Sequence, residues 1–283
     1  MALLIVCGLA LALIAWLAAH PLLQAWRRDR LQRQPFPQAW RRILRRRVPQ
    51  IAQLPADQQL RLKKLIQVFV AEKSFIGCAG LRISDEIRIT IAAQACLPLL
   101  GAARGFYPQL RQILVYPGAF VVDRVAGGPA GVQMEQRRAL AGESWSQGQV
   151  ILSWQDVVEG AANPADGRNV VIHEFAHQLD QAKGHANGAP PLRDRAAYAR
   201  WSAVMQAEYD ALCARAARGE PSLMSDYGAT DPAEFFAVAS EVFFEQPLLL
   251  AQAHPALYRE LAGYYRFHPA GAPNENYSSS SAA

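Results

Sequence analysis

The chain has 283 residues, of which 51% are hydrophobic and 19% are charged, and this length allows a single core with a cleft. Its formal net charge is +5. Nine arginines between residues 27 and 47, against the one acid Asp29, contribute +8, and subtracting this from +5 leaves −3 for the rest of the chain. Because the positive charge belongs to one short segment, a nucleic-acid-binding enzyme is disfavoured.

The N-terminal residues predict a membrane anchor. Residues 1–26 contain no Asp, Glu, Lys or Arg, and this uncharged stretch is interrupted by His20 and Pro21. About 20 apolar residues cross the hydrocarbon core of a bilayer, so we expect one transmembrane helix over residues 1–26. The arginines that follow predict a basic juxtamembrane linker over residues 27–50 on the cytoplasmic side. A cleaved signal peptide is the alternative, but no basic segment precedes the apolar run.

The elements that follow predict one α+β domain over residues 51–269, with a small mixed sheet. Apolar spacing predicts a helix over residues 56–72. Strands are expected, from their β-branched and aromatic residues, over residues 87–93, 113–116, 120–123 and 149–154, although residues 87–100 also fit a helix. Further helices are expected over residues 196–217 and 255–267, and the serine-rich tail over residues 270–283 is expected to be disordered.

Residues 173–177 read His-Glu-Phe-Ala-His, an H-E-x-x-H motif within a helix-compatible apolar run. With six His and thirteen Glu in the chain, only about 0.006 such matches are expected by chance. Residues four apart lie one turn above each other, so His173 and His177 project from one face and can bind one metal ion. Imidazole suits Zn²⁺, and Glu174 is the expected general base for a zinc-activated water. The alternative is a buried helix with two incidental histidines.

A catalytic zinc site needs a third protein ligand. The pattern H-E-x-x-H-x-x-G-x-x-H is excluded, because Asp180 and Lys183 stand where it has Gly and His. A carboxylate from a second predicted helix, residues 232–245, is the remaining option. Three glutamates lie near one face of that helix: Glu234, Glu241 and Glu245. Ionised carboxylates in so apolar a helix need partners, such as a metal or a metal-bound histidine. Alternatively, they form a solvated stripe.

Residues 227–241, Tyr-Gly-Ala-Thr-Asp-Pro-Ala-Glu-Phe-Phe-Ala-Val-Ala-Ser-Glu, read together with residues 173–177, resemble the Mlc titration factor A family of zinc peptidases. They resemble more distantly the catalytic domain of anthrax lethal factor. The segments 113–123, 142–148 and 150–154 also resemble that family, so the resemblance covers about residues 55–269.

The resemblance implies a zincin-like fold of the gluzincin type and an aminopeptidase-like activity on peptide or protein substrates. It implies that Glu234 joins His173 and His177 in holding Zn²⁺, and that Tyr227 points at the metal site. A phenol there can donate a hydrogen bond to a developing oxyanion. With the apolar N-terminus, this predicts a single-pass protein of the bacterial inner membrane whose catalytic domain faces the cytoplasm.

Two further expectations concern the surroundings of the motif. Glu241 and Asp180 are candidates to orient a ligating histidine. Zinc peptidases of this kind bind the substrate backbone along an edge strand beside the motif helix, and residues 142–154 are the nearest candidate.

Two functions remain open. The first is a zinc peptidase that is linked to the regulation of sugar uptake through a transcriptional repressor of the Mlc type, as the resemblance implies. The alternative is a regulatory protein that sequesters such a repressor, with zinc mainly ordering the fold. Structural zinc sites usually close all four positions with Cys or His, so a ligand set accompanied by Glu174 favours the enzyme.

Overall fold

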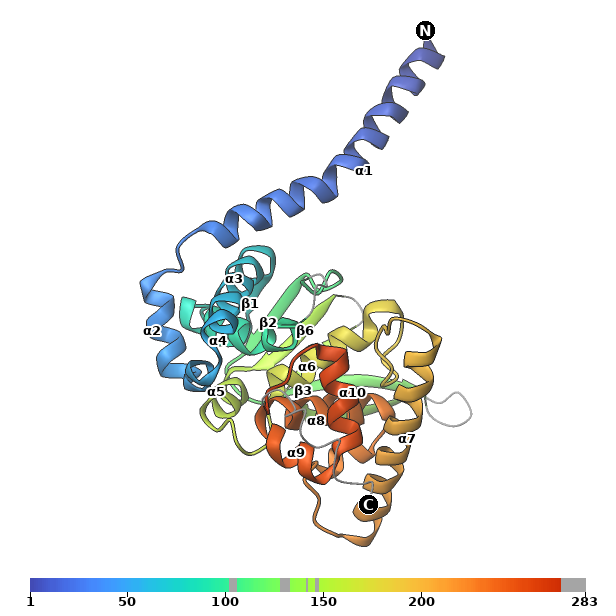
Figure 1. Ribbon diagram of the computed structural model, residues 1–283. Helices are drawn as coiled ribbons and strands as arrows, with labels where there is room; N and C mark the ends of the chain where they lie inside the picture. The colour runs from blue at the N-terminus through green and yellow to red at the C-terminus, as the bar shows by residue number, and fades with distance from the viewer. Residues whose placement is uncertain (102–105, 128–132, 141, 146–147, 271–283) are drawn as a thin grey trace, which may run out of the picture.

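The computed structural model describes residues 1–101, 106–127, 133–140, 142–145 and 148–270 (Figure 1). Most of the chain is helical and surrounds a small sheet, while the N-terminal half of helix α1 (Ala2–Arg33) projects away from the body. Apart from residue 270, the tail expected to be disordered lies outside the described residues.

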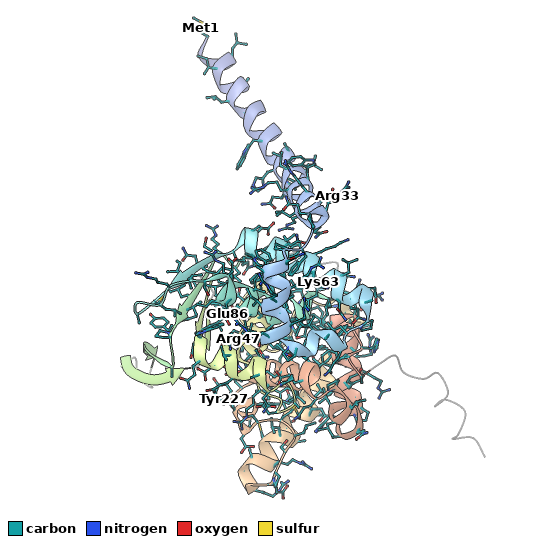
Figure 2. The ribbon with its side chains drawn as sticks, turned by 90° about the vertical axis from the view of Figure 1, so that its left-hand side faces the viewer. Met1, Arg33, Arg47, Lys63, Glu86 and Tyr227 are labelled. Atoms are coloured by element: carbon teal, nitrogen blue, oxygen red, sulfur yellow. The ribbon has the colours of Figure 1, made fainter. Side chains whose placement is uncertain are left out.

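The base of α1 is held against the body by ion pairs. Arg28 Nε lies 2.6 Å from Glu72 Oε1 at the end of helix α3 (Ala56–Glu72). Helix α2 (Gln38–Arg47) packs on helix α4 (Asp85–Ala95), where Arg46 and Arg47 both pair with Glu86. Figure 2 shows Arg47 beside Glu86, and Met1 at the far end of α1. The arginine-rich segment expected as a linker is therefore largely helical, and Arg28, Arg46 and Arg47 pair with acids of the body.

The predicted membrane anchor requires a correction. A span needs about 20 consecutive apolar residues, and within the described residues no helix has an apolar run long enough to cross a bilayer. The described part of α1 instead reaches His20 and Pro21 and continues without a break into its arginines. The predicted transmembrane helix is wrong for the part of the chain that the structure describes. The prediction of a single-pass inner-membrane protein, attached by this helix and its arginines, is wrong with it.

Three parallel strands form the centre of the sheet. They are β1 (Ser74–Gly77), β2 (Gln112–Tyr116) and β6 (Gln149–Ser153), in the order β1-β2-β6, with Ile113 of β2 opposite Phe75 and Val150. Strand β5 (Gly142–Trp145) pairs antiparallel with β6 at the edge. Strands β3 (Phe120–Gly127) and β4 (Gln133–Leu140) form a separate antiparallel pair. Ile113 and Val115 of β2 and all three apolar side chains of β6 are buried, because helices cover the parallel strands.

The fold class predicted from the sequence is also corrected, from a zincin-like α+β domain preceded by a transmembrane helix to a mostly helical fold around a small sheet whose three central strands are parallel. Residues 87–93, expected as a strand, lie in α4. Ser84 caps this helix by accepting the N–H of Ile87 at 3.3 Å, and Asp85 and Glu86 follow in the first turn. Because residues 89–95 are all buried, their apolar pattern reflects burial on every side and not a strand.

The remaining helices build the C-terminal half of the body. They are α5 (Trp154–Ala162), α6 (Val170–Asp180), α7 (Arg195–Arg218), α8 (Pro232–Glu245), α9 (Pro247–Ala253) and α10 (Pro255–Tyr265). Helix α6, which carries the H-E-x-x-H motif, is anchored by Phe175, whose ring lies 5.6 Å from that of Phe69 and 4.8 Å from that of Tyr107. Its opposite side faces α8.

One turn, which follows α6 in the sequence, packs against both the end of α6 and the start of α8. Asp180 Oδ2 accepts the N–H groups of Asn187 and Gly188, each at 2.7 Å, and Trp201 of α7 donates to the carbonyl of Gly188 at 2.8 Å. Gly188 has φ +75°, and a Cβ atom there would lie 2.3 Å from the carbonyl oxygen of Pro232. A glycine is therefore required where this turn contacts the first residue of α8.

We expect Gly188→Ala to lower the free energy of unfolding by about 1–3 kcal/mol. Residue 188 has a left-handed backbone conformation, which alanine disfavours, and the new methyl group would collide with the α8 backbone. Denaturant unfolding measures the change. Gly263→Ala is the matched control: no atom lies within 4 Å of a Cβ at that helical position, so its stability should be unchanged or slightly higher. Equal stabilities of the two variants would contradict this account.

Candidate metal centre

The N-terminus of α6 sets the orientation of the motif. Asn169 is the N-cap, and its Oδ1 accepts the N–H of Ile172 at 3.0 Å. The helix that follows places His173 and His177 one turn apart, with ring centroids 4.9 Å from each other. Glu174 lies between them in sequence and is only 4% exposed. The motif is thus held on the buried side of a capped helix.

Glu234 reaches both histidines from the first turn of α8. Its Oε2 lies 3.0 Å from Nε2 of His173 and 3.4 Å from Nε2 of His177. Asp231 caps α8 by accepting the N–H groups of Ala233 and Glu234, at 2.9 and 3.0 Å. The capped first turn therefore places the carboxylate against the histidine pair.

This arrangement fits a divalent cation. One donor atom each from His173, His177 and Glu234 lies within 4.8 Å of the others, and no other such cluster occurs among the described residues. Tetrahedral ligands about 2.0–2.1 Å from Zn²⁺ stand about 3.3 Å apart, close to the Nε2–Oε2 separations found here. Two imidazoles and a carboxylate are also the donor set of many catalytic zinc sites. The three residues could therefore hold a metal with small adjustments.

The pKa values of His173 and Glu234 are shifted in opposite directions. Burial lowers the pKa of His173, but hydrogen bonds with Glu234 and Glu241 outweigh it and hold this pKa well above its ordinary value. Burial raises the pKa of Glu234, but hydrogen bonds with His173 and His177 outweigh it and hold this pKa below its ordinary range. A metal cation would supply positive charge between the three side chains and would require a neutral imidazole at each histidine.

Glu241 lies behind His173. Its Oε1 lies 2.8 Å from Nδ1 of the imidazole, and its Oε2 accepts the main-chain N–H of Asn169. A carboxylate on Nδ1 fixes the ring so that Nε2 faces Glu234. Asp180, the other residue expected to orient a histidine, accepts hydrogen bonds from the turn that contains Gly188. Glu241 therefore contacts a histidine that could bind the metal, whereas Asp180 binds a turn.

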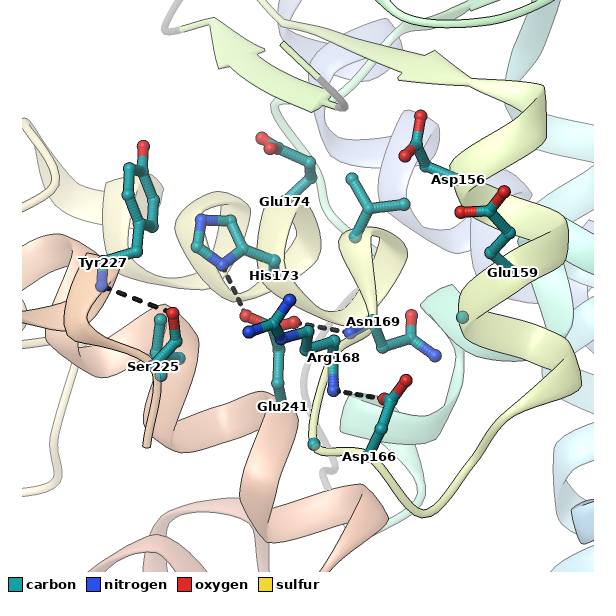
Figure 3. A pocket seen from close by; sticks show the side chains of 14 residues that line it. Asp156, Glu159, Asp166, Arg168, Asn169, His173, Glu174, Ser225, Tyr227 and Glu241 are labelled. Carbon is teal, nitrogen blue, oxygen red and sulfur yellow. Dashed lines mark hydrogen bonds and ion pairs between the residues drawn. The ribbon is translucent and has the colours of Figure 1, made fainter. Parts of the chain in front are cut away.

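A cavity of about 580 Å³ opens beside the motif and is bordered by α5, α6 and the segment before α8 (Figure 3). Five carboxylates line it, against the one guanidinium of Arg168: Asp156, Glu159, Asp166, Glu174 and Glu241. In Figure 3, Asp156 and Glu159 project from α5 on the wall opposite Tyr227, with Glu174 between the two walls. The cavity is therefore predominantly anionic apart from any bound metal.

Tyr227 borders the same cavity from the short helix η5 (Asp226–Ala229). Its ring centroid lies 5.9 Å from that of His173, and the residue is 45% exposed. Strand β5, within the segment expected to be the substrate edge, is the edge strand of the central sheet and contacts α6. Tyr227 and the edge strand β5, both expected near the motif, therefore lie next to it.

Three residues of the site were missed by the sequence reasoning or given no role. Asn169 Nδ2 donates to Gln94 Oε1 of α4 at 2.8 Å and to Glu245 Oε1 of α8 at 2.9 Å. The position of Asn169 directly before the motif helix was a local signal for a cap. No sequence signal pointed to Gln94, because it lies 75 residues away from Asn169.

The chain is similar to known proteins over almost its whole length. A family model described as glucose-regulated metallo-peptidase M90 matches residues 23–266. An uncharacterised protein of Synechocystis sp. is 41% identical over 94% of this chain and 97% of its own length. Mlc titration factor A of Enterobacter sp. is 36% identical over 81% of this chain and 86% of its own length, and that of Salmonella agona is 37% identical over 78% and 84%.

Glu245 predicts a pH dependence of stability. Burial, together with the nearby charges of Asp166 and Glu241, raises its pKa to about 8 despite the hydrogen bond from Asn169. The folded protein therefore keeps a proton that the unfolded chain loses above about pH 4.3, so this group destabilises the fold progressively as pH rises to about 8. We expect Glu245→Gln to reduce the stability lost between pH 6 and pH 9 by about 1–2 kcal/mol.

Denaturant unfolding of the metal-free protein at the two pH values measures this difference. Glu220→Gln is the control, because Glu220 is exposed and its pKa is lowered, so it is ionised at both pH values. If the parent and the Glu245→Gln protein lose the same stability between pH 6 and pH 9, the buried-carboxyl account is wrong.

Proposed function

Because this chain belongs to the glucose-regulated metallo-peptidase M90 family, we propose that it is a zinc-dependent peptidase of the gluzincin type. His173, His177 and Glu234 would hold the zinc. The observation that carries this assignment is the convergence of one carboxylate oxygen on the Nε2 atoms of both motif histidines. The family makes the chain a metallopeptidase, and the choice of zinc rests on the donor set.

Bound zinc would lower the pKa of a water molecule and polarise the substrate carbonyl. Glu174 would take a proton from the attacking water and pass it to the leaving amine. Its low exposure and its place between the two histidines in the sequence support this role, because a carboxylate beside the metal site can take a proton from the metal-activated water. Tyr227 would donate a hydrogen bond from its phenol to the oxyanion that develops on the carbonyl.

We expect Glu174→Gln to keep about one zinc per chain and to lose at least 100-fold in kcat, because the amide cannot accept the proton. Glu234→Ala should lose zinc, because two imidazoles alone remain. Metal analysis and peptide hydrolysis, measured side by side on the same preparations, test both expectations. Glu220→Gln, an exposed glutamate on the surface, should match the parent in both. Full hydrolysis by Glu174→Gln would refute the mechanism.

We further propose that the substrate is bound by its free amino terminus, as in an aminopeptidase. The anionic cavity supports this, because Asp156 and Glu159 face the same space as Glu174 and His173. A substrate ammonium group placed near these carboxylates would orient the first peptide bond toward Glu174. These carboxylates therefore support the aminopeptidase-like activity that the resemblance implies.

Asp156→Asn should raise KM about 3–10-fold for a short peptide with a free amino terminus, because one partly exposed charge pair is worth about 1 kcal/mol. Its kcat should stay within about twofold, since Asp156 does not take part in the proton transfer. Asp210→Asn on α7, outside the cavity, is the control. If the variant and the parent cleave this peptide with the same KM, or if the parent cleaves the N-acetylated peptide as well as the free one, recognition of the amino terminus is excluded.

The regulatory function is the second candidate. Relatives that are 36–37% identical carry the name Mlc titration factor A, which favours binding of a transcriptional repressor of the Mlc type by this chain too. In that case the zinc would mainly order the contact between α6 and α8. The Glu174→Gln protein separates the two candidates, because repressor binding that survives the loss of hydrolysis would favour a binding role.

A further inference from the structure

Asn169 is the point where three elements meet behind the metal centre. It is 1% exposed, and every polar atom it directs toward the site has a partner. Its Oδ1 caps α6 through Ile172, its Nδ2 donates to Gln94 of α4 and Glu245 of α8, and its main-chain N–H donates to Glu241. Both amide hydrogens and the amide oxygen are therefore used, and their partners define the orientation of the side chain.

Asn169 reaches the metal centre in two ways: its main-chain carbonyl accepts the N–H of His173 at 2.9 Å, and its main-chain N–H holds Glu241. Glu241 divides its two oxygens between the main-chain N–H of Asn169 and Nδ1 of His173, so moving residue 169 moves the carboxylate on the imidazole. His177 has no equivalent support: its Nδ1 is buried and has no hydrogen-bond partner among the described residues. Of the two motif histidines, only His173 is oriented by a carboxylate behind it.

We propose that Asn169 is a positioning residue for the metal centre, which holds Glu241 against His173 through its main-chain N–H while its side-chain amide is clamped between Gln94 and Glu245. The inference rests on the proposed metal site at His173, but not on peptide hydrolysis. It goes beyond helix capping, because a cap needs only Oδ1, whereas the two bonds from Nδ2 tie residue 169 to α4 and α8.

The clamp can be tested by exchanging donor and acceptor. Asn169→Asp keeps the shape and the cap, because Asp is as good an N-cap as Asn, but it places an acceptor against Gln94 Oε1 and Glu245 Oε1. Adding Glu245→Gln gives that position an amide that can donate to the new carboxylate. The single variant should therefore lose both side-chain hydrogen bonds to Gln94 and position 245, and residue 169 should shift. The double variant should restore the hydrogen bond to position 245.

The measurement is the zinc affinity of the metal-free protein, determined by competition with a chelator at pH 9, where Glu245 with its pKa of about 8 is ionised. We expect Asn169→Asp to weaken zinc binding about 10–100-fold, as changes behind a ligating histidine do. The double variant should recover at least fivefold of that loss. Glu245→Gln alone should stay within about threefold of the parent, since it keeps an atom that accepts from Nδ2.

Two comparisons separate an effect on the metal centre from an effect on the fold. Thermal unfolding of the metal-free proteins reports what residue 169 contributes to stability; if Asn169→Asp changes stability but not zinc affinity, Asn169 supports only the fold and the inference is wrong. The same holds if the double variant binds zinc as weakly as the single one. Should Asn169→Asp fail to fold, Asn169→Ser replaces it, because serine keeps a cap and removes only the Nδ2 donor.

Failure of the proposed peptidase would be seen separately. A parent protein that binds zinc but cleaves no peptide would refute the hydrolysis assignment and leave the affinity comparison intact. A parent that binds no zinc would refute both the metal site and this inference.

Discussion

Glu241 joins the two helices on which the site is built. Its carboxylate accepts the first main-chain N–H before α6 and contacts the imidazole of His173, although it belongs to α8. A carboxylate that is 8% exposed is costly to bury unless both oxygens have partners. Here the motif helix supplies both of them, so the energetics of burial and the geometry of the candidate centre are satisfied by the same contacts.

The rest of the fold places these helices at the correct distance. Caps at Asn169 and Asp231 define where α6 and α8 begin, and the turn at Gly188 sets one against the other. The aromatic contacts of Phe175 anchor α6 to the core on its other side. The site therefore depends on rigid, capped helices, which is the arrangement that holds donor atoms most precisely.

The cavity beside the centre is electrostatically uneven. Carboxylates gather on α5 and on the loop before α6, while His173 and Tyr227 border the other wall. Such a field attracts cations from solution, and under the proposed function a substrate ammonium group would lie within reach of Glu174. A metal ion and a positively charged substrate group would thus be stabilised by neighbouring parts of one anionic surface.

The sequence by itself determined what is local. The H-E-x-x-H spacing, the caps and the helix over residues 56–72 depend on neighbours within a few residues, and the glutamate helix was expected over the residues it occupies. Residues 87–93 were ambiguous because burial on all sides removes the periodic signal, and the structure makes them helical. The N-terminal span was wrong for the described residues, because composition alone does not decide whether a helix crosses a bilayer. Only the tertiary structure decided which carboxylate meets which histidine, and that Gln94, Asn169 and Glu245 meet at all, since these contacts join residues about 61 to 76 positions apart.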